Sequence, residues 1–267
     1  MVKKLPKNKH VKTSSKSLHG FNLKSKGAEM PEERYKTRRY LPSPEETDQK
    51  LFCTENITLP MLQEAYWHGF FPWPEDKEST EIPWVNPQGR GLIPLAVFHI
   101  PHTVKRLLKN GLFELRIDTA FEDVLAMCAE RNDGSDTWIT PEIKKNYAEF
   151  HKIGWAHSFE AWSRKNGNLV GGLYGISIGK IFAGESMFYR ESGASKFALA
   201  CLGLVLTECG VQLLDTQMVT PVTEQFGAKY FYRGDYLDAL EYLRDTPITT
   251  EQLRTAAEKL KSEGKIC

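Results

Sequence analysis

Three polar side chains stand inside otherwise apolar stretches of the chain. Glu185 lies within residues 181–188, and Asp215 and Gln217 lie within residues 211–218. A buried carboxylate is costly unless it has a partner, so each is either bonded to a neighbouring strand or kept for chemistry. Because side chains alternate along a strand, Asp215 and Gln217 are expected on one face. Such a pair can hold and polarise a reacting amine; the alternative is a satisfied pair of buried hydrogen-bonding groups.

Other chemical signals are weaker. Residues 190–195 (RESGAS) precede an expected helix and approach the (Q/R)xxGx(G/A) loop with which acetyltransferases bind the pyrophosphate of coenzyme A, although Ser195 stands where Gly or Ala is expected. The 7 histidines and 5 cysteines lack the spacing of a zinc site, and neither a GxSxG nor a Walker motif occurs. We therefore expect neither a metal site nor a serine hydrolase, with an acetyl-CoA-dependent N-acyltransferase as an alternative.

Periodicity and turn residues predict the elements that carry these side chains. Turn dipeptides at 166–167 and 179–180 favour an antiparallel meander of three strands. Thr119 with Glu122 resembles a helix capping box, and Thr140 caps a helix that begins with proline. Together these signals indicate an α+β fold. We expect helices over residues 59–68, 103–109, 119–131, 140–152, 194–208 and 250–261, and strands over 95–100, 113–117, 155–162, 169–178, 180–188 and 211–218.

An aromatic, proline-rich region follows the first expected helix, at residues 70–87. It holds too many prolines for a regular strand or helix and too many rings for a solvated loop, so it must pack against something. We interpret Phe70 and Phe71 as part of a small core. Trp73 and Trp84 are interpreted as the wall of a ligand cleft, because rigid rings beside proline suit a preformed pocket.

Composition excludes several classes of protein. The chain has 267 residues, of which 41% are hydrophobic, as in an ordinary globular protein. No apolar run approaches the ~20 residues of a membrane-spanning helix, and the first thirty residues lack the apolar core of a signal peptide. An odd number of cysteines without CxxC spacing fits reduced thiols. We therefore expect a cytoplasmic protein without a membrane partner.

The charge is unevenly distributed. Residues 1–39 hold 12 Lys or Arg against 3 Asp or Glu, a net charge of +9, whereas residues 40–267 hold 23 against 31, a net charge of −8. Residues 1–26 are too polar to bury a core and are predicted to be disordered, before a proline-rich bridge at 41–44. A basic arm of this kind either contacts phosphates or is a solvated tail.

Seven longer strings stand out along the chain: 66–73 (YWHGFFPW), 138–140 (WIT), 156–162 (AHSFEAW), 169–175 (LVGGLYG), 184–188 (GESMF), 194–196 (ASK) and 215–217 (DTQ). In this order they resemble the motifs of the leucyl/phenylalanyl-tRNA–protein transferase family. The resemblance covers about residues 58–240. It implies an enzyme that moves leucine or phenylalanine, or methionine, from aminoacyl-tRNA to the N-terminal Arg or Lys of a protein, marking that protein for N-degron degradation. It needs no cofactor, and we expect a monomer.

The resemblance also implies a domain order and a set of site residues. A small N-terminal domain would precede an acetyltransferase-like (GNAT-like) mixed-sheet domain, which divides the chain into a basic arm (1–39), a small domain (40–91), a transferase domain (92–245) and a C-terminal helix and tail (246–267). Glu185, Asp215 and Gln217 would be catalytic. Residues 220–226 depart from the family pattern, so the acceptor preference is not carried over, and a binding relative without activity is a further alternative. The remaining assignments are Tyr66, Trp73, Trp138 and Tyr147 for the tRNA 3′ adenosine, and Leu173, Phe182, Met187 and Leu199 for the aminoacyl side chain.

Overall fold

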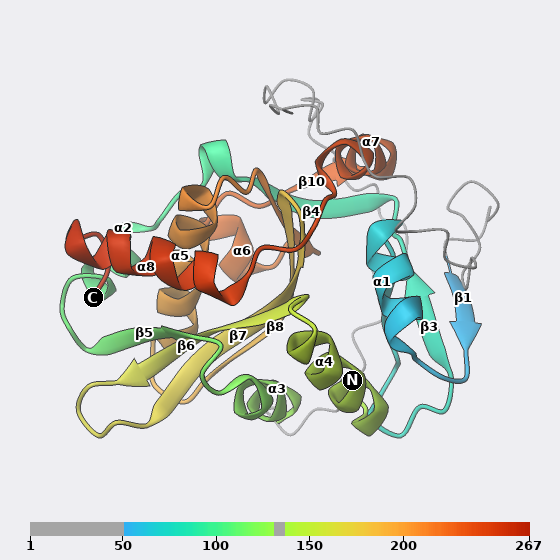
Figure 1. Ribbon diagram of the computed structural model, residues 1–267, viewed down its shortest axis with the longest axis horizontal. Helices are drawn as coiled ribbons and strands as arrows, with labels where there is room; N and C mark the ends of the chain where they lie inside the picture. Colours follow the sequence, from blue (N-terminus) through green and yellow to red (C-terminus); the bar gives the residue numbers. More distant parts are fainter. Residues whose placement is uncertain (1–50, 131–136) are drawn as a thin grey trace.

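The computed structural model describes residues 51–130 and 137–267 (Figure 1). The predictions for the basic arm, for disorder over 1–26 and for the bridge at 41–44 lie outside the described residues. Within the described ranges the chain forms a mixed α/β fold, with a seven-stranded sheet and a smaller three-stranded sheet.

The large sheet has the strand order β10-β4-β9-β8-β7-β6-β5. Neighbouring strands are antiparallel except for β8 and β9, which are parallel and joined by the crossover helix α5 (Ala194–Glu208). The expected meander is confirmed as β6-β7-β8. The strands are β4 (Gly89–Pro94), β5 (Phe113–Ile117), β6 (Ala156–Ser163), β7 (Leu169–Ile178), β8 (Ile181–Tyr189), β9 (Leu213–Gln217) and β10 (Lys229–Tyr232).

Helices cover both faces of this sheet, and each face has its own core. In Figure 1, α5 and α8 (Thr250–Ser262) lie over one face, and α3 (Phe121–Ala129) and α4 (Pro141–Lys152) lie over the other. Because side chains alternate along β7, Leu173 belongs to the core beneath α5 and Tyr174 to the core beneath α3 and α4. The other helices of this part of the chain are α2 (His102–Leu107), α6 (Pro221–Gln225) and α7 (Arg233–Leu243).

The aromatic region forms the smaller sheet, so the expectation that its prolines exclude regular strands is wrong. The pairing is short: β1 (Leu51–Thr54), β3 (Ile82–Val85) and β2 (Phe71–Pro72) lie in that order beside α1 (Leu59–Trp67). Proline is tolerated because few ladder bonds are needed and its carbonyl still accepts, as Pro83 does from the Trp73 N–H at 2.7 Å.

Three of the four aromatic assignments in this region are settled by burial. Phe70 and Phe71 are buried, which confirms their place in a core. Trp84 is wrong as a cleft residue: it is fully buried, and its indole N–H donates to the Thr54 hydroxyl at 2.9 Å. Trp84 faces inward because it lies in the central strand β3 of the small sheet.

Several other elements differ from the predicted ones in their bounds or in their caps. The strand expected at 95–100 lies earlier, as β4, and is followed by the 3₁₀ turn η2 (Leu95–Val97). The capping box at Thr119 is wrong, because the Thr119 hydroxyl is bonded to Glu160 and Ala120 occupies the cap position of α3. The Thr140 cap is confirmed. Residues 221–243, for which no element was predicted, form α6, β10 and α7.

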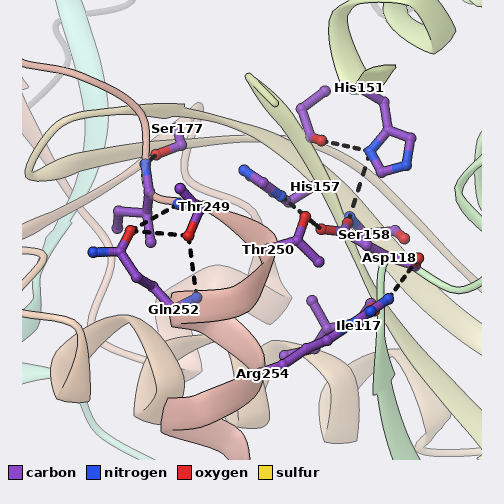
Figure 2. A network of polar contacts seen from close by, with 12 residues as sticks. Ile117, Asp118, His151, His157, Ser158, Ser177, Thr249, Thr250, Gln252 and Arg254 are labelled. Carbon is purple, nitrogen blue, oxygen red and sulfur yellow. Dashed lines mark hydrogen bonds and ion pairs between the residues drawn. The ribbon is translucent and has the colours of Figure 1, made fainter. Parts of the chain in front are cut away.

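The C-terminal helix is tied to the sheet by a polar network at the end of β5 (Figure 2). Asp118 accepts a hydrogen bond from the Thr250 hydroxyl at 2.6 Å and lies 2.7 Å from the His157 ring nitrogen Nδ1. Arg254 donates to the carbonyl oxygen of Ile117 at 2.7 Å. The first turns of α8 are therefore held by charged and polar bonds as well as by apolar packing. No helix in the part of the chain that the structure describes is long and apolar enough to cross a membrane.

Thr250→Val keeps the shape of the side chain but removes the hydrogen bond to the Asp118 carboxylate. We expect the free energy of unfolding to fall by about 1.5–3 kcal/mol, the usual size for a bond to a charged group. Urea unfolding measures the change. The matched control is Thr246→Val, at an exposed position, where about 0.5 kcal/mol or less is expected. Equal losses in the two variants would contradict the anchoring role of the network.

Candidate active site

A cleft opens where the parallel strands β8 and β9 part. The two strands pair only from Ile181 with Leu213 to Ala183 with Asp215. Glu185 follows at a bulge in β8, because Gly184 pairs with Gly175 while Ser186 pairs with Tyr174. A bulge re-aims a side chain and interrupts regular pairing. The cleft beside it has a volume of about 530 Å³.

The cleft brings together many of the residues singled out from the sequence. Its wall includes Glu185 and Gln217 on the polar side, Trp73 and Trp138 on the aromatic side, and an apolar group. The apolar group is Leu173, Met187, Leu199, Leu202 and Leu214, of which sequence reasoning named the first three. Phe182 is fully buried in the core beneath α5, with its ring against Phe159, and is not among the described lining residues.

The four residues predicted to contact a nucleotide separate into two pairs. The Trp73 and Trp138 rings stack on each other, with centroids 5.9 Å apart and planes at 13°. Tyr66 and Tyr147 are buried, and their hydroxyl oxygens lie 2.5 Å apart. Burial raises the pKa of both phenols, and the charge of Glu185 raises it further. The tyrosine pair therefore lies close to Glu185, while the tryptophan pair lines the cleft.

Glu185 is the titratable group at the base of the cleft. Its Oε1 atom accepts a hydrogen bond from the Gln217 carboxamide nitrogen at 2.8 Å. Its Oε2 atom is buried and has no hydrogen-bond partner among the described residues. Burial raises the pKa of the Glu185 carboxyl from 4.5 to about 7, against hydrogen bonds from Tyr66 and Gln217 that lower it. A carboxyl with this pKa exists in both forms near neutral pH.

Asp215 is not among the described lining residues of the cleft, because it forms a buried ion pair with Arg90. The sequence analysis did not single out Arg90. Arg90, from β4, is fully buried together with Asp215. Its Nε and Nη2 atoms donate to the two carboxylate oxygens at 2.9 and 2.7 Å. The Oδ1 atom of Asp215 also accepts from the backbone N–H of Gln217 at 2.8 Å. Asp215 thus binds the backbone of Gln217, whose side chain lies in the cleft.

The segment 190–195 forms the turn before α5 and the start of that helix, and it lies outside the lining of the cleft as described. Gly193 has φ 87° and precedes α5, as expected of a loop before a helix. Gly171 packs so closely beneath this turn that a Cβ atom would lie 2.5 Å from the Cβ of Ala194. The segment is not among the described lining residues of the cleft.

Within residues 51–130 and 137–267, no group of three His, Cys, Asp or Glu side chains is placed to hold a metal ion.

Comparison with known proteins shows the family of this chain. The family model described as leucyl/phenylalanyl-tRNA protein transferase matches residues 92–241. A protein of that name from Paramagnetospirillum magneticum (strain ATCC 700264 / AMB-1) is 43% identical over 185 residues, 69% of this chain and 88% of that protein. One from Tolumonas auensis (strain DSM 9187 / NBRC 110442 / TA 4) is 38% identical over 217 residues, 79% of this chain and 91% of that protein.

These similarities define an enzyme of the aminoacyltransferase class. The chain belongs to the leucyl/phenylalanyl-tRNA–protein transferase family. Among solved structures, a functionally unknown conserved protein from Staphylococcus epidermidis ATCC 12228 aligns over 67% of this chain and 66% of that chain, with a TM-score of 0.38 and 13% identity. This likeness is too low to assign a fold family.

The raised pKa of Glu185 predicts a pH-dependent effect of Glu185→Gln. Folding disfavours the ionised carboxyl. The contribution of Glu185 to the free energy of unfolding is therefore fully present below pH 4.5, where the carboxyl is neutral, and is lost as the pH rises through about 7. The variant is neutral throughout and can still accept from Gln217. At pH 8 we expect it to be more stable than the wild type by about 1–2 kcal/mol, a gain discounted because Glu185 is partly exposed.

Urea unfolding at pH 5 and pH 8 measures this gain, which should nearly vanish at the lower pH. Glu55→Gln, at an exposed position, is the control and should show no gain on going to pH 8. A Glu185→Gln variant that is equally destabilised at both pH values would contradict the assignment of Glu185 as a group held against its ionised form.

Proposed function

We propose that this chain transfers leucine, phenylalanine or methionine from aminoacyl-tRNA to the N-terminal α-amine of a protein that begins with Arg or Lys. The product would be marked for N-degron degradation in the cytoplasm. The observation that carries the proposal is the cleft itself, in which the Gln217 carboxamide adjoins an apolar pocket, together with a Glu185 oxygen that has no hydrogen-bond partner among the described residues. Family membership supplies the reaction class.

The chemistry needs orientation more than activation. The acceptor nitrogen attacks the ester carbonyl carbon, a C–N bond forms, and the C–O bond to the ribose breaks. The nitrogen loses a proton and the leaving ribose oxygen gains one, so the reaction balances without an oxidant or any reactant beyond the aminoacyl-tRNA and the acceptor amine. Holding amine and ester in attack geometry supplies up to about 7–11 kcal/mol, and a positioned proton acceptor adds about 10²–10⁴ in rate.

Gln217 and Glu185 take the two polar roles. The Gln217 nitrogen is bonded to Glu185, so its carbonyl oxygen is left to accept a hydrogen from the attacking amine. The Glu185 carboxylate, with one oxygen unpartnered among the described side chains, attracts an ammonium group of a substrate and stabilises the positive charge that forms on nitrogen. Asp215 contributes by holding the Gln217 backbone.

The apolar residues of the cleft account for the donor side chain. Leu173, Met187 and Leu199, with Leu202 and Leu214, form a pocket that suits side chains unbranched at Cβ. Phe182 would act from behind this pocket, through packing. A methylene is worth about 1–3 kcal/mol of discrimination, so leucine, phenylalanine and methionine should overlap as donors.

The tRNA end and the fold complete the proposal. The stacked pair Trp73 and Trp138 offers a surface for the 3′ adenine, a contact worth about 1–3 kcal/mol per base. Tyr66 and Tyr147 would then act on the site indirectly, because their buried hydroxyls lie beside the Glu185 carboxyl. We also propose that the large sheet is GNAT-like, because its two parallel strands part at the site. The division at 40–91, 92–245 and 246–267, and a monomeric state, belong to the same proposal.

The transfer reaction is tested with labelled Leu-tRNA and a peptide that begins with Arg. We expect transfer by the wild type and a loss in kcat of about 10²–10³ for Gln217→Ala, the usual range for losing one preorganised hydrogen bond to the reacting groups. A peptide that begins with Glu and a reaction with acetyl-CoA in place of tRNA are the controls. Acetyl transfer without aminoacyl transfer would overturn the proposal in favour of an N-acyltransferase, and binding without transfer would favour an inactive relative.

Donor choice is tested by narrowing the pocket with Leu199→Phe. The added volume should lower kcat/KM for Phe-tRNA more than for Leu-tRNA, so that their ratio changes by about 10-fold. Leu204→Phe is the matched control, because Leu204 lies on the same helix but is not among the described lining residues of the cleft. The pocket assignment fails if both variants change the two donors equally.

A further inference from the structure

Arg90 lies outside the cleft, yet its contacts lead step by step to the reacting groups. Its Nη1 atom donates to the Gly69 carbonyl oxygen at 2.9 Å. Its guanidinium carbon lies 4.7 Å from the centre of the Phe71 ring and 4.5 Å from that of Tyr236. The planar group is thus bonded on one edge, enclosed by two rings, and free to meet Asp215 only in one orientation.

Asp215 is fully engaged by this arrangement. Oδ2 accepts from Nη2 of Arg90 at 2.7 Å, and Oδ1 accepts from Nε of Arg90 at 2.9 Å and from the Gln217 N–H at 2.8 Å. Tyr236 also contacts the Asp215 carboxylate. Of the contacts that the described residues make with Asp215, the one that leads towards the cleft is the backbone of Gln217, so the effect of Asp215 on the reaction passes through that backbone.

The backbone of Gln217 needs such a restraint. Its φ is 60°, in the left-handed region that a non-glycine residue adopts at a cost. Gly91 makes room for the turn, because a Cβ atom there would lie 2.6 Å from the carbonyl carbon of Met218. In this conformation the Gln217 carboxamide meets Glu185 at 2.8 Å.

We propose that Arg90 is a positioning residue of the transfer reaction: it fixes Asp215, which fixes the left-handed backbone of Gln217 and so aims the carboxamide at Glu185 and the ester. The inference rests on the proposed function, which it deepens. It assigns Asp215 to positioning as well, and leaves Gln217 and Glu185 as the groups that touch the substrates.

Arg90→Lys is the first test, because it keeps the charge and loses the two-nitrogen clamp on Asp215. We expect kcat to fall by about 10–100-fold, as for a small misplacement of a reacting group, while KM for aminoacyl-tRNA changes by about 2-fold or less. The matched control is Arg254→Lys, which also loses a clamp by two nitrogens, here on the Ile117 carbonyl. It should lower the melting temperature and leave kcat of the folded enzyme unchanged.

A pH profile separates positioning from a merely structural role. The Asp215 charge raises the pKa of Glu185 and the Arg90 charge lowers it, while the buried hydroxyls of Tyr66, Tyr147 and Tyr174 surround the same carboxyl. The rise of kcat/KM with pH should therefore move to higher pH in Arg90→Gln, to lower pH in Asp215→Asn, and back towards the wild type in the double variant. General loss of stability produces no such opposite shifts.

The outcomes are distinct. A folded Arg90→Lys enzyme with wild-type kcat, or single variants whose profiles coincide with that of the wild type, overturns the inference while Gln217→Ala can still report on the reaction. If Arg90→Gln does not fold, Arg90→Lys decides by itself. If the wild type transfers no amino acid from tRNA, the proposed function fails, whatever Arg90 does.

Discussion

A buried guanidinium between two sheets sets the geometry of the site. Arg90 is fully inaccessible and joins the large sheet, through Asp215, to the region of the small sheet, through Gly69 and Phe71. Removing two charges from water costs several kcal/mol per ion, so a buried ion pair is seldom the most stabilising choice for a core. What it supplies is direction: an apolar pair of equal volume could pack in many ways, whereas the guanidinium and carboxylate fit in one. The ion pair therefore costs stability but fixes the position of the polar side chains of the cleft.

The parting of β8 and β9 explains why the cleft lies where it does. Parallel strands normally remain paired along their length, and here the pairing ends after Ala183. Beyond it the bulge at Glu185 and the left-handed turn at Gln217 point two polar side chains at each other across the opening. Neither deviation is favourable alone. They persist because the paired parts of the two strands, Ile181–Ala183 and Leu213–Asp215, are buried between the core beneath α5 and the core beneath α3 and α4.

Local signals in the sequence predict the elements that depend on local bonds. Thr140 with its following proline, the meander turns and the helix from Ala194 are all found where their patterns place them, since each depends on neighbours within a few residues. The errors occur where distant contacts decide. The Thr119 hydroxyl bonds to Glu160, 41 residues away, instead of capping its helix. The strand expected at 95–100 lies at Gly89–Pro94 instead, where the backbone of Met218 and Val219 packs against Gly91. Proline in β3 misleads in the same way.

The residues of the site also divide into those that local sequence patterns reveal and those that depend on distant contacts. Glu185 and Gln217 can be singled out because a polar residue in an apolar run is visible in the sequence, whereas Arg90 stands among glycines and prolines and gives no such signal. A physical rule could still have found it. Asp215 lies in a strand buried on both faces, so its charge requires a cation from an adjacent strand, and β4 pairs with β9 from Gly91 to Pro94. Arg90 is the one cation in β4. The partner of a buried charge is thus predictable once the strand order is known, and strand order is what local patterns do not encode.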